Sequence, residues 1–257
     1  MNFIFIGDVV GKCGCDALEK SLANLKREYK AQVVIVNGEN SADTNGITVR
    51  SMRRIFDAGA DVITTGNHAF HRDEILEEFE RNPRLIRPAN YGEDVSGRGF
   101  CELDFGSCRA AVVNLSGNAF MQPCDNPFKC AETLLGQIDA NMIIVDFHAE
   151  ATAEKRTMGF FLAGKVSAVL GTHTHVQTAD ERILDGTAYI TDVGMTGASD
   201  SVIGVEKSAA IDRFYSYIHC KNTFAYGDAE VCGVFLDIDE KSGKCRSIER
   251  IRNIIKT

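Results

Sequence analysis

The sequence predicts an α/β fold, and two observations lead to this prediction. The first is that short apolar runs alternate along the 257 residues with amphipathic stretches of helical periodicity. The second is that the apolar runs end in turns carrying Gly, Asp, Asn or His, as buried strands do. No repeat, low-complexity tract or proline-rich linker divides the chain. We therefore expect one domain over residues 1–257.

Strands and helices alternate in the first third of the chain. Within the first predicted helix, Leu18, Leu22 and Leu25 recur at helical spacing, with lysine and glutamate between them. Strands are predicted at Phe3–Ile6, Val33–Val36 and Asp61–Thr64, and helices at Asp16–Tyr29, Thr48–Phe56 and Arg72–Phe79. This order is typical of α/β architecture.

The rest of the chain adds two probable hairpins to this pattern. The turn residues Gly106-Ser107 separate two strand-like runs, and Glu240-Lys241-Ser242-Gly243 separates two others. The predicted strands are Gly99–Phe105, Arg109–Leu115, Met142–Asp146, Ala168–Leu170, Glu230–Asp237 and Cys245–Ile251, and the helix Thr152–Leu162 lies between the middle two. Antiparallel pairs are thus expected beside the alternating strands and helices.

The composition limits the classes of partner. The net charge of −8 is the opposite of what a sequence-independent DNA binder carries, although 28 Lys and Arg residues leave material for a local basic patch. No apolar run approaches the ~20 residues that cross a bilayer. We expect neither a membrane nor sequence-specific nucleic acid as a partner.

Cysteine usage and the N-terminus predict a cytoplasmic location. The nine cysteines are odd in number and include no CxxC pair, which favours reduced thiols over a disulfide framework. The apolar run 1–6 stops at Gly7-Asp8 and lacks the basic start and the length of a signal peptide.

Polar side chains that can offer a lone pair to a metal ion follow five predicted strands. Open α/β sheets place their ligand sites at the carboxyl ends of their strands. The candidates are Asp8, Glu39, Asn40, Asn67, His148, His173 and His175. Each has a plainer alternative: Asp8 as a helix cap, Gly66-Asn67-His68 as an ordinary turn, a lone His148 as a structural histidine. Five such coincidences together are improbable, so we interpret these residues as one site.

The donor set indicates transition metals. Three imidazoles, two carboxylates and two amide oxygens suit iron or manganese, with zinc as a further candidate, and are too rich in nitrogen for calcium. Seven side chains exceed what one tetrahedral ion uses, whereas two ions that share a bridging carboxylate would use them all. Paired ions are a recurring device in phosphoryl hydrolysis.

The order of these motifs resembles the calcineurin-like metallophosphoesterases, and most closely the bacterial YmdB family of cyclic-nucleotide phosphodiesterases. The resemblance runs from Met1 to about Ile251. It is carried by Gly7-Asp8, Gly38-Glu39-Asn40, Gly66-Asn67-His68, Arg87-Pro88-Ala89-Asn90, Asp146-Phe147-His148-Ala149-Glu150, Gly171-Thr-His173-Thr-His175-Val-Gln-Thr-Ala-Asp180 and Thr191-Asp192-Val-Gly-Met-Thr-Gly197. Such long blocks are far more specific than one Gly-Asn-His.

The resemblance implies a four-layer fold, in which two mixed sheets pack face to face with helices outside. It also implies that Asp8, Asn40 and His175 hold one ion and that Asn67, His148 and His173 hold the other, with Glu39 bridging. His68 would not ligate but would serve catalysis at the substrate phosphate. A metal-bridging hydroxide would attack 2′,3′-cyclic or 3′,5′-cyclic nucleotides, and the chain would form a homo-oligomer.

Two positions depart from the family pattern. Broad metallophosphoesterases carry histidine where this chain has Val10, so Asn40 is expected to take that coordination place and to change the metal preference. Closer relatives often carry aspartate where this chain has His71, which bears on how His68 is tuned.

Five further residues have weaker grounds. The resemblance suggests Asn90, Thr174 and Met195 as lining of the substrate pocket, and a structural role is as good a reading for each. Asp180 and Asp192 are candidates to orient a ligand histidine through its outer nitrogen, or are turn residues.

The sequence bears on three rival functions. A phosphate loop at Gly7–Lys12 has three residues between its glycines instead of four, and Cys13 stands where serine or threonine would meet magnesium. A serine esterase needs a nucleophilic serine in a sharp turn after a strand, and the first turn has none. A metal-binding regulatory protein that senses a nucleotide or a partner, with little or no turnover, remains the open alternative.

Overall fold

The first of two sheets is built from the N-terminal strands and the C-terminal hairpin. The computed structural model describes residues 1–216 and 223–256. The strands are β1 (Asn2–Ile6), β2 (Asp8–Val9), β3 (Val33–Asn37), β4 (Val62–Thr64), β11 (Met195–Ala198), β12 (Ala229–Ile238) and β13 (Cys245–Ile255). They run in the order β2-β11-β12-β1-β3-β4, and β13 pairs with β12. The strands β1, β3 and β4 are parallel, so their carboxyl ends meet at one edge.

The second sheet has six strands from the middle of the chain. They are β5 (Phe100–Asp104), β6 (Arg109–Ser116), β7 (Met142–His148), β8 (Ala168–Thr172), β9 (Arg182–Leu184) and β10 (Thr187–Ile190), in the order β5-β6-β7-β8-β10-β9. The four inner strands are parallel, and antiparallel partners flank them on both sides. Both sheets are therefore mixed.

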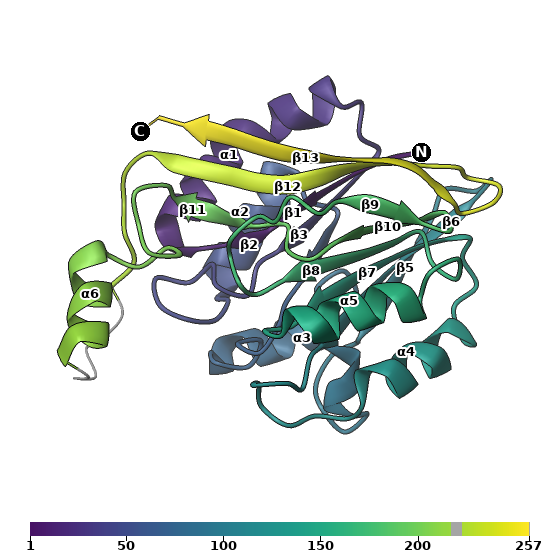
Figure 1. Cartoon of the computed structure of the whole chain (residues 1–257), viewed down its shortest axis with the longest axis horizontal. Coiled ribbons are helices and arrows are strands. Elements are labelled where there is room, and N and C mark those ends of the chain that lie inside the picture. The colour runs from purple at the N-terminus through teal and green to yellow at the C-terminus, as the bar shows by residue number, and fades with distance from the viewer. Residues whose placement is uncertain (217–222, 257) are drawn as a thin grey trace.

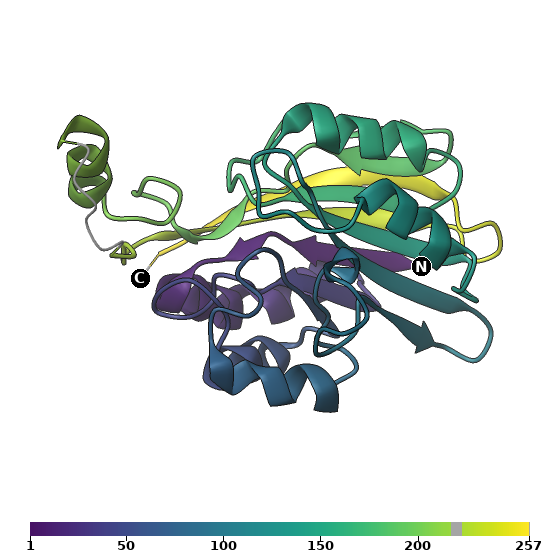
Figure 2. The same ribbon diagram turned by 90° about the horizontal axis from the view of Figure 1, so that it is seen from below.

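The two sheets face each other, and helices cover the outer face of each (Figures 1 and 2). The helices are α1 (Gly11–Glu28), α2 (Val49–Ala58), α3 (Leu76–Arg81), α4 (Pro127–Leu135), α5 (Thr152–Phe161) and α6 (Lys207–Ser216), with 3₁₀ turns η1 (Asp73–Ile75) and η2 (Ala89–Tyr91). One apolar core lies between α1–α3 and the first sheet, a second between the sheets, and a third between the second sheet and α4 and α5. This confirms the four-layer α/β/β/α sandwich.

The three cores explain why strand β1 is apolar at consecutive positions. Side chains of a strand alternate between its two faces. Phe3 and Phe5 enter the core between the sheets, whereas Ile4 and Ile6 pack against the first helical layer. A strand with both faces covered reads as an unbroken apolar run.

Most predicted elements are confirmed, and two need correction. Helix α1 begins at Gly11, five residues before the predicted start, because Gly11 takes a positive φ of 57° that turns the chain straight out of β2. The helix predicted at Arg72–Phe79 is a 3₁₀ turn followed by α3, which ends at Arg81. The sequence reading missed β2, α4, β9, β10, β11 and α6. The single domain stays a prediction.

Helix α6 stands apart from the layered body in both views (Figures 1 and 2). Of its residues only Ala210 is buried, whereas Phe214 and Tyr215 are 76% and 88% exposed. Among the described residues, no helix is both long and apolar enough to cross a membrane. Eight cysteines within the described ranges are free thiols, and Cys220 lies outside those ranges.

We expect Gly7→Ala to destabilise the fold strongly. A Cβ at position 7 would lie 1.8 Å from the carbonyl oxygen of Gly194, and backbone cannot yield as a flexible side chain can. The expected loss is about 3–5 kcal/mol of unfolding free energy in urea titration. Gly136→Ala is the matched control, because its Cβ would meet nothing closer than 3.4 Å. Equal stability of the two variants would contradict the close approach.

Candidate metal centre

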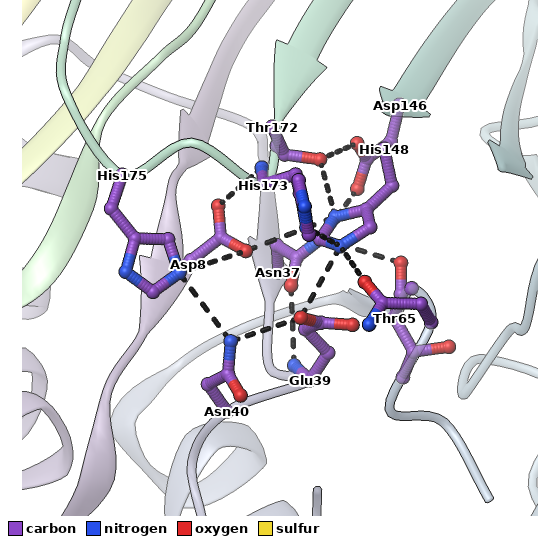
Figure 3. A network of polar contacts seen from close by, with 12 residues as sticks. Asp8, Asn37, Glu39, Asn40, Thr65, Asp146, His148, Thr172, His173 and His175 are labelled. Atoms are coloured by element: carbon purple, nitrogen blue, oxygen red, sulfur yellow. Dashed lines mark hydrogen bonds and ion pairs between the residues drawn. The ribbon is translucent and has the colours of Figure 1, made fainter. Parts of the chain in front are cut away.

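All seven predicted ligands converge where the two sheets meet. Asp8, Glu39, Asn40 and Asn67 come from β2 and from the turns after β3 and β4, in the first sheet. The three histidines come from the end of β7 and the turn after β8, in the second. Figure 3 shows Asp8, Glu39 and Asn40 facing His148, His173 and His175. Oxygen-bearing side chains thus lie on one side of the centre and imidazoles on the other.

The distances within this cluster suit a cation. The Nε2 atom of His148 lies 3.0 Å from Nδ1 of His173, 3.0 Å from Oδ1 of Asn67 and 3.2 Å from Oε1 of Glu39. The ligand atoms of Glu39, His148 and His173 all lie within 4.8 Å of one another. Four atoms that can each offer a lone pair therefore point at one small volume.

Asp8 supplies a further observation of the same kind. Its side chain is fully buried, and its Oδ1 atom has no hydrogen-bond partner among the described residues. That oxygen lies 3.8 Å from Nε2 of His175 and 3.8 Å from Nδ1 of His148. A buried carboxylate oxygen without a donor is costly unless a cation meets it. The residues present therefore fit a metal centre.

Each ligand histidine has its outer nitrogen held by an acceptor. His175 pairs Nδ1 with the carbonyl oxygen of Ile203 at 2.9 Å, and His173 pairs Nε2 with Glu150 at 3.0 Å. The Thr172 hydroxyl donates to Oδ1 of Asp146 at 2.7 Å, so it accepts from Nδ1 of His148 at 2.9 Å. These partners fix the tautomers and turn the lone pair of every inner nitrogen toward the centre.

Asp146 also joins the two sheets behind the centre. Its Oδ2 accepts from the Asn37 amide at 2.9 Å, and Oδ1 of Asn37 in turn accepts from the backbone of Glu39 at 3.1 Å. The sequence reading did not assign either residue. A signal existed, because Asp146 lies two positions before His148 on one strand and therefore on the same face.

The ionisation of the centre reflects burial and mutual charge. Burial raises the pKa of Asp8 and, acting on Asp146, raises its pKa to about 6. Burial opposes the charged form of Glu39, but His148 and His68 outweigh it and hold the Glu39 pKa well below its usual value. Burial likewise opposes imidazolium at His148, yet Glu39 and Asp8 raise the His148 pKa to about 9. Burial, aided by His148, lowers the pKa of His173 to about 3.

His68 lies beside the cluster and not within it. Its Nδ1 atom is 3.0 Å from Oδ1 of Asn40 and 3.2 Å from Oε1 of Glu39. Its Nε2 atom is 3.3 Å from the Asn45 amide, and its ring lies beside that of His71, with centroids 4.5 Å apart and the planes tilted by 37°. The side chain is 19% exposed, which leaves it reachable from solvent.

Asn40 turns its amide nitrogen toward Oε1 of Glu39 at 2.9 Å and toward Nε2 of His175 at 3.4 Å. Its oxygen faces His68. Rotation of the amide group by half a turn would bring the oxygen to the side of His175, as ligation requires.

The residues suggested for the pocket are engaged elsewhere. Asn90 is 1% exposed and bonds the backbone of Ser116 through both amide atoms. Met195 is 3% exposed and pairs in register with Asp8. Thr174 bonds Asp192 through its hydroxyl and its backbone N–H. These contacts favour the structural reading of all three residues.

The two carboxylates that were predicted to orient a ligand histidine also have other partners. Asp180 accepts from Thr178 and from the backbone and hydroxyl of Thr191. Asp192 accepts from Thr174, Lys155 and the backbone of Gly194. No ligand histidine is among these hydrogen-bond partners. The outer nitrogens are instead held by Glu150, by Thr172 and by the carbonyl of Ile203.

A surface hollow of about 1340 Å³ lies beside β5 and α4. None of the seven candidate ligands lines it. Donor chemistry, and not cavity size, therefore locates the candidate site.

Comparison with known proteins decides the family. The model of the YmdB-like protein family matches residues 4–251. The chain belongs to the YmdB-like family. This YmdB-like chain is 44% identical over 254 residues to the 2′,3′-cyclic-nucleotide 2′-phosphodiesterase of Bacillus subtilis, across 98% of this chain and 96% of that protein.

Two crystal structures resemble the YmdB-like chain over nearly its whole length. A novel phosphatase from Mycoplasma pneumoniae superposes with a TM-score of 0.95 at 35% identity, over 100% of this chain and 94% of that one. A hypothetical protein from Thermus thermophilus superposes with a TM-score of 0.93 at 37% identity, over 99% of both chains. The YmdB-like chain is thus a hydrolytic phosphoesterase.

Proposed function

We propose that the chain is a binuclear metal-dependent phosphodiesterase that hydrolyses 2′,3′-cyclic nucleotides. The observation that carries the proposal is the convergence of three imidazoles, two carboxylates and two amides on one buried centre between the sheets. The name of the Bacillus subtilis relative, 44% identical, supports the substrate class. Hydrolysis of 3′,5′-cyclic nucleotides stays a prediction.

The geometry supports two groups of ligands around a shared carboxylate. Asp8, Asn40 and His175 gather on one side of Glu39, and Asn67, His148 and His173 on the other. Glu39 is 0% exposed, and its Oε1 lies between the two groups, 2.9 Å from the amide nitrogen of Asn40 and 3.2 Å from Nε2 of His148. We infer that it bridges two ions, with manganese or iron favoured by the mixed nitrogen and oxygen donors and zinc as a further candidate.

The residues around the centre would divide the work of hydrolysis. When bound, the ions lower the pKa of the attacking water and neutralise charge on the phosphoryl oxygens. His68 would serve the leaving oxygen with a proton on Nε2, while a second proton on Nδ1 is donated toward Glu39 and Asn40. Glu150, Thr172 and the carbonyl of Ile203 would keep the three histidines in the ligating tautomer.

Metal analysis together with turnover tests the proposal. We expect about two Mn²⁺ ions per chain after reconstitution, and hydrolysis of 2′,3′-cyclic AMP that EDTA abolishes and Mn²⁺ restores. Two ions without turnover of any phosphodiester would instead favour a regulatory protein that senses a nucleotide. The absence of bound metal after reconstitution with manganese or iron would overturn the proposal.

We expect Thr172→Val to weaken metal binding while the protein stays folded. The change removes the hydroxyl that links Nδ1 of His148 to Asp146, so nothing fixes that imidazole's tautomer. Loss of such a partner typically costs 10–100-fold in metal affinity. Calorimetric titration of the metal-free variant with Mn²⁺ measures it. Thr157→Val is the control, because that hydroxyl donates to the backbone of its own helix. Equal affinities of Thr172→Val and the wild type would exclude the role.

Two further inferences from the sequence stay predictions. They are the cytoplasmic location and the assembly into a homo-oligomer.

A further inference from the structure

The two histidines after β8 lie on a strained stretch of backbone. His173 and His175 have φ angles of 97° and 65°, a region that residues other than glycine rarely adopt. Such conformations persist only where the surroundings fix them, and they are common at functional sites. Thr174 lies between the two histidines, so whatever holds Thr174 sets the direction of both rings.

Asp192 holds Thr174 from the neighbouring strand. Its Oδ2 atom accepts from the Thr174 backbone N–H at 3.0 Å and from the Thr174 hydroxyl at 2.6 Å. Its Oδ1 atom accepts from the backbone N–H of Gly194 at 2.8 Å. Asp192 is 0% exposed and lies two residues after the end of β10, which pairs with β8. The carboxylate is therefore a fixed anchor for the strained turn.

Lys155 completes this anchor from helix α5. Its Nζ atom donates to Oδ2 of Asp192 at 2.8 Å and lies 3.5 Å from the Thr174 hydroxyl. The residue is 1% exposed, and a lysine is almost never so buried unless it is paired. Its stem passes Gly171, where a Cβ would lie 3.1 Å from Cδ of the lysine. Lys155 is thus built into the wall behind the two ligands, and none of the contacts at the centre uses it.

We propose that the buried Lys155–Asp192 ion pair is a positioning device for the metal centre, which acts through Thr174 to hold His173 and His175 in the ligating direction. The inference rests on the proposed function, because it takes the two histidines as ligands. It assigns a role to Lys155, which has none in the hydrolysis proposed above. It also changes the role of Asp192 from a partner of a histidine ring to an anchor of the backbone between two rings.

The sign of the change in metal affinity separates a positioning role from a through-space charge effect. If the pair acted only through its charges, removal of the Lys155 cation would strengthen cation binding and removal of the Asp192 anion would weaken it. If the pair positions the turn, both changes weaken binding. If the pair serves only general stability, both lower the unfolding temperature and leave the metal affinity of the folded protein unchanged.

The experiment compares Lys155→Met, Asp192→Asn and the double variant with the wild-type chain. Lys165→Met is the matched control, because Lys165 is exposed and follows the same helix. The dissociation constants for Mn²⁺ are measured by calorimetric titration of the metal-free proteins. Amide hydrogen exchange over residues 172–176 is measured without metal, which gives a readout independent of activity.

We expect about tenfold or greater weakening of Mn²⁺ binding in both single variants, and faster exchange at the Thr174 amide. The double variant should be no weaker than Asp192→Asn alone, because the lysine works through the aspartate. Tighter Mn²⁺ binding by Lys155→Met, or wild-type affinity with wild-type exchange, would overturn the inference and leave the proposed function standing. A wild-type chain that binds no Mn²⁺ would overturn both.

Thr174→Val tests the same link if the lysine variant does not fold. It removes only the hydroxyl that donates to Asp192 and keeps the shape of the side chain. Several-fold weaker Mn²⁺ binding with faster exchange supports the anchor. Unchanged affinity and exchange in a folded Thr174→Val protein count against it.

Discussion

Replacement of Glu39 by glutamine is expected to lower kcat/KM for bis-p-nitrophenyl phosphate about 10³-fold, or about 4 kcal/mol. Glu39 is fully buried; its Oε1 lies 3.2 Å from Nε2 of His148, and its Oε2 accepts from the backbone N–H of His68 at 3.1 Å. Glutamine places an N–H₂ donor at one of these two positions and removes the charge that two cations would share. Metal content should fall with activity, as elemental analysis of the purified variant would show.

The matched control is Glu77→Gln, a change at an exposed carboxylate that pairs with Arg81 of the same helix. It should leave both activity and metal content unchanged. If Glu39→Gln kept two ions and wild-type kcat/KM, Glu39 would have no bridging role, and the two groups of ligands would need a different link.

Replacement of His68 by alanine is expected to lower kcat for 2′,3′-cyclic AMP by about 10²–10⁴-fold, the usual range for a general acid. Metal content should not change, because His68 stands beside the ligands and not among them. Hydrolysis of bis-p-nitrophenyl phosphate should suffer much less, since p-nitrophenolate leaves without protonation. The two substrates, compared in stopped assays on one preparation, give the measurement.

His71→Gln is the control for this prediction. The ring of His71 lies beside that of His68, with centroids 4.5 Å apart. The change therefore tests whether the neighbouring imidazole contributes to the reaction. We expect less than tenfold loss on either substrate. Equal losses of His68→Ala on both substrates would argue for a role in binding or in site architecture, and full activity on the cyclic nucleotide would remove His68 from the mechanism.

The candidate ligands were predictable because each follows a strand whose apolar run is visible in the sequence. Parallel strands bring their carboxyl ends together, so Glu39 and Asn67 had to be neighbours once β3 and β4 were recognised. The pairing of two sheets was not visible in this way. It came from resemblance. The neighbour of Asp8 within the first sheet was equally hidden, because Asp8 lies in the two-residue strand β2, which pairs with β11 nearly 190 residues later.

The partners that hold the histidines could not be predicted from local pattern. The carbonyl of Ile203 reaches His175 from a loop with no periodicity of its own, and any residue type offers a carbonyl. The Lys155–Asp192 pair depends on how α5 packs on the second sheet. Strand β11 was missed because Met195–Ala198 is too short to carry an alternating pattern. Tertiary packing, and not propensity, decides all three.

The division of donors between the sheets makes metal binding a clamp on the fold. The oxygens come from one sheet and the imidazoles from the other, so neither sheet alone offers a complete coordination shell. Ions that bind only the docked pair stabilise the native state by RT ln(1 + [M]/Kd), about 2.7 kcal/mol at a hundredfold excess over Kd. The unfolding temperature should therefore rise with the free concentration of the right metal. The metal-loaded protein would then be both the active form and the more stable form. Scarcity of metal would lower the stability of the enzyme as well as its activity.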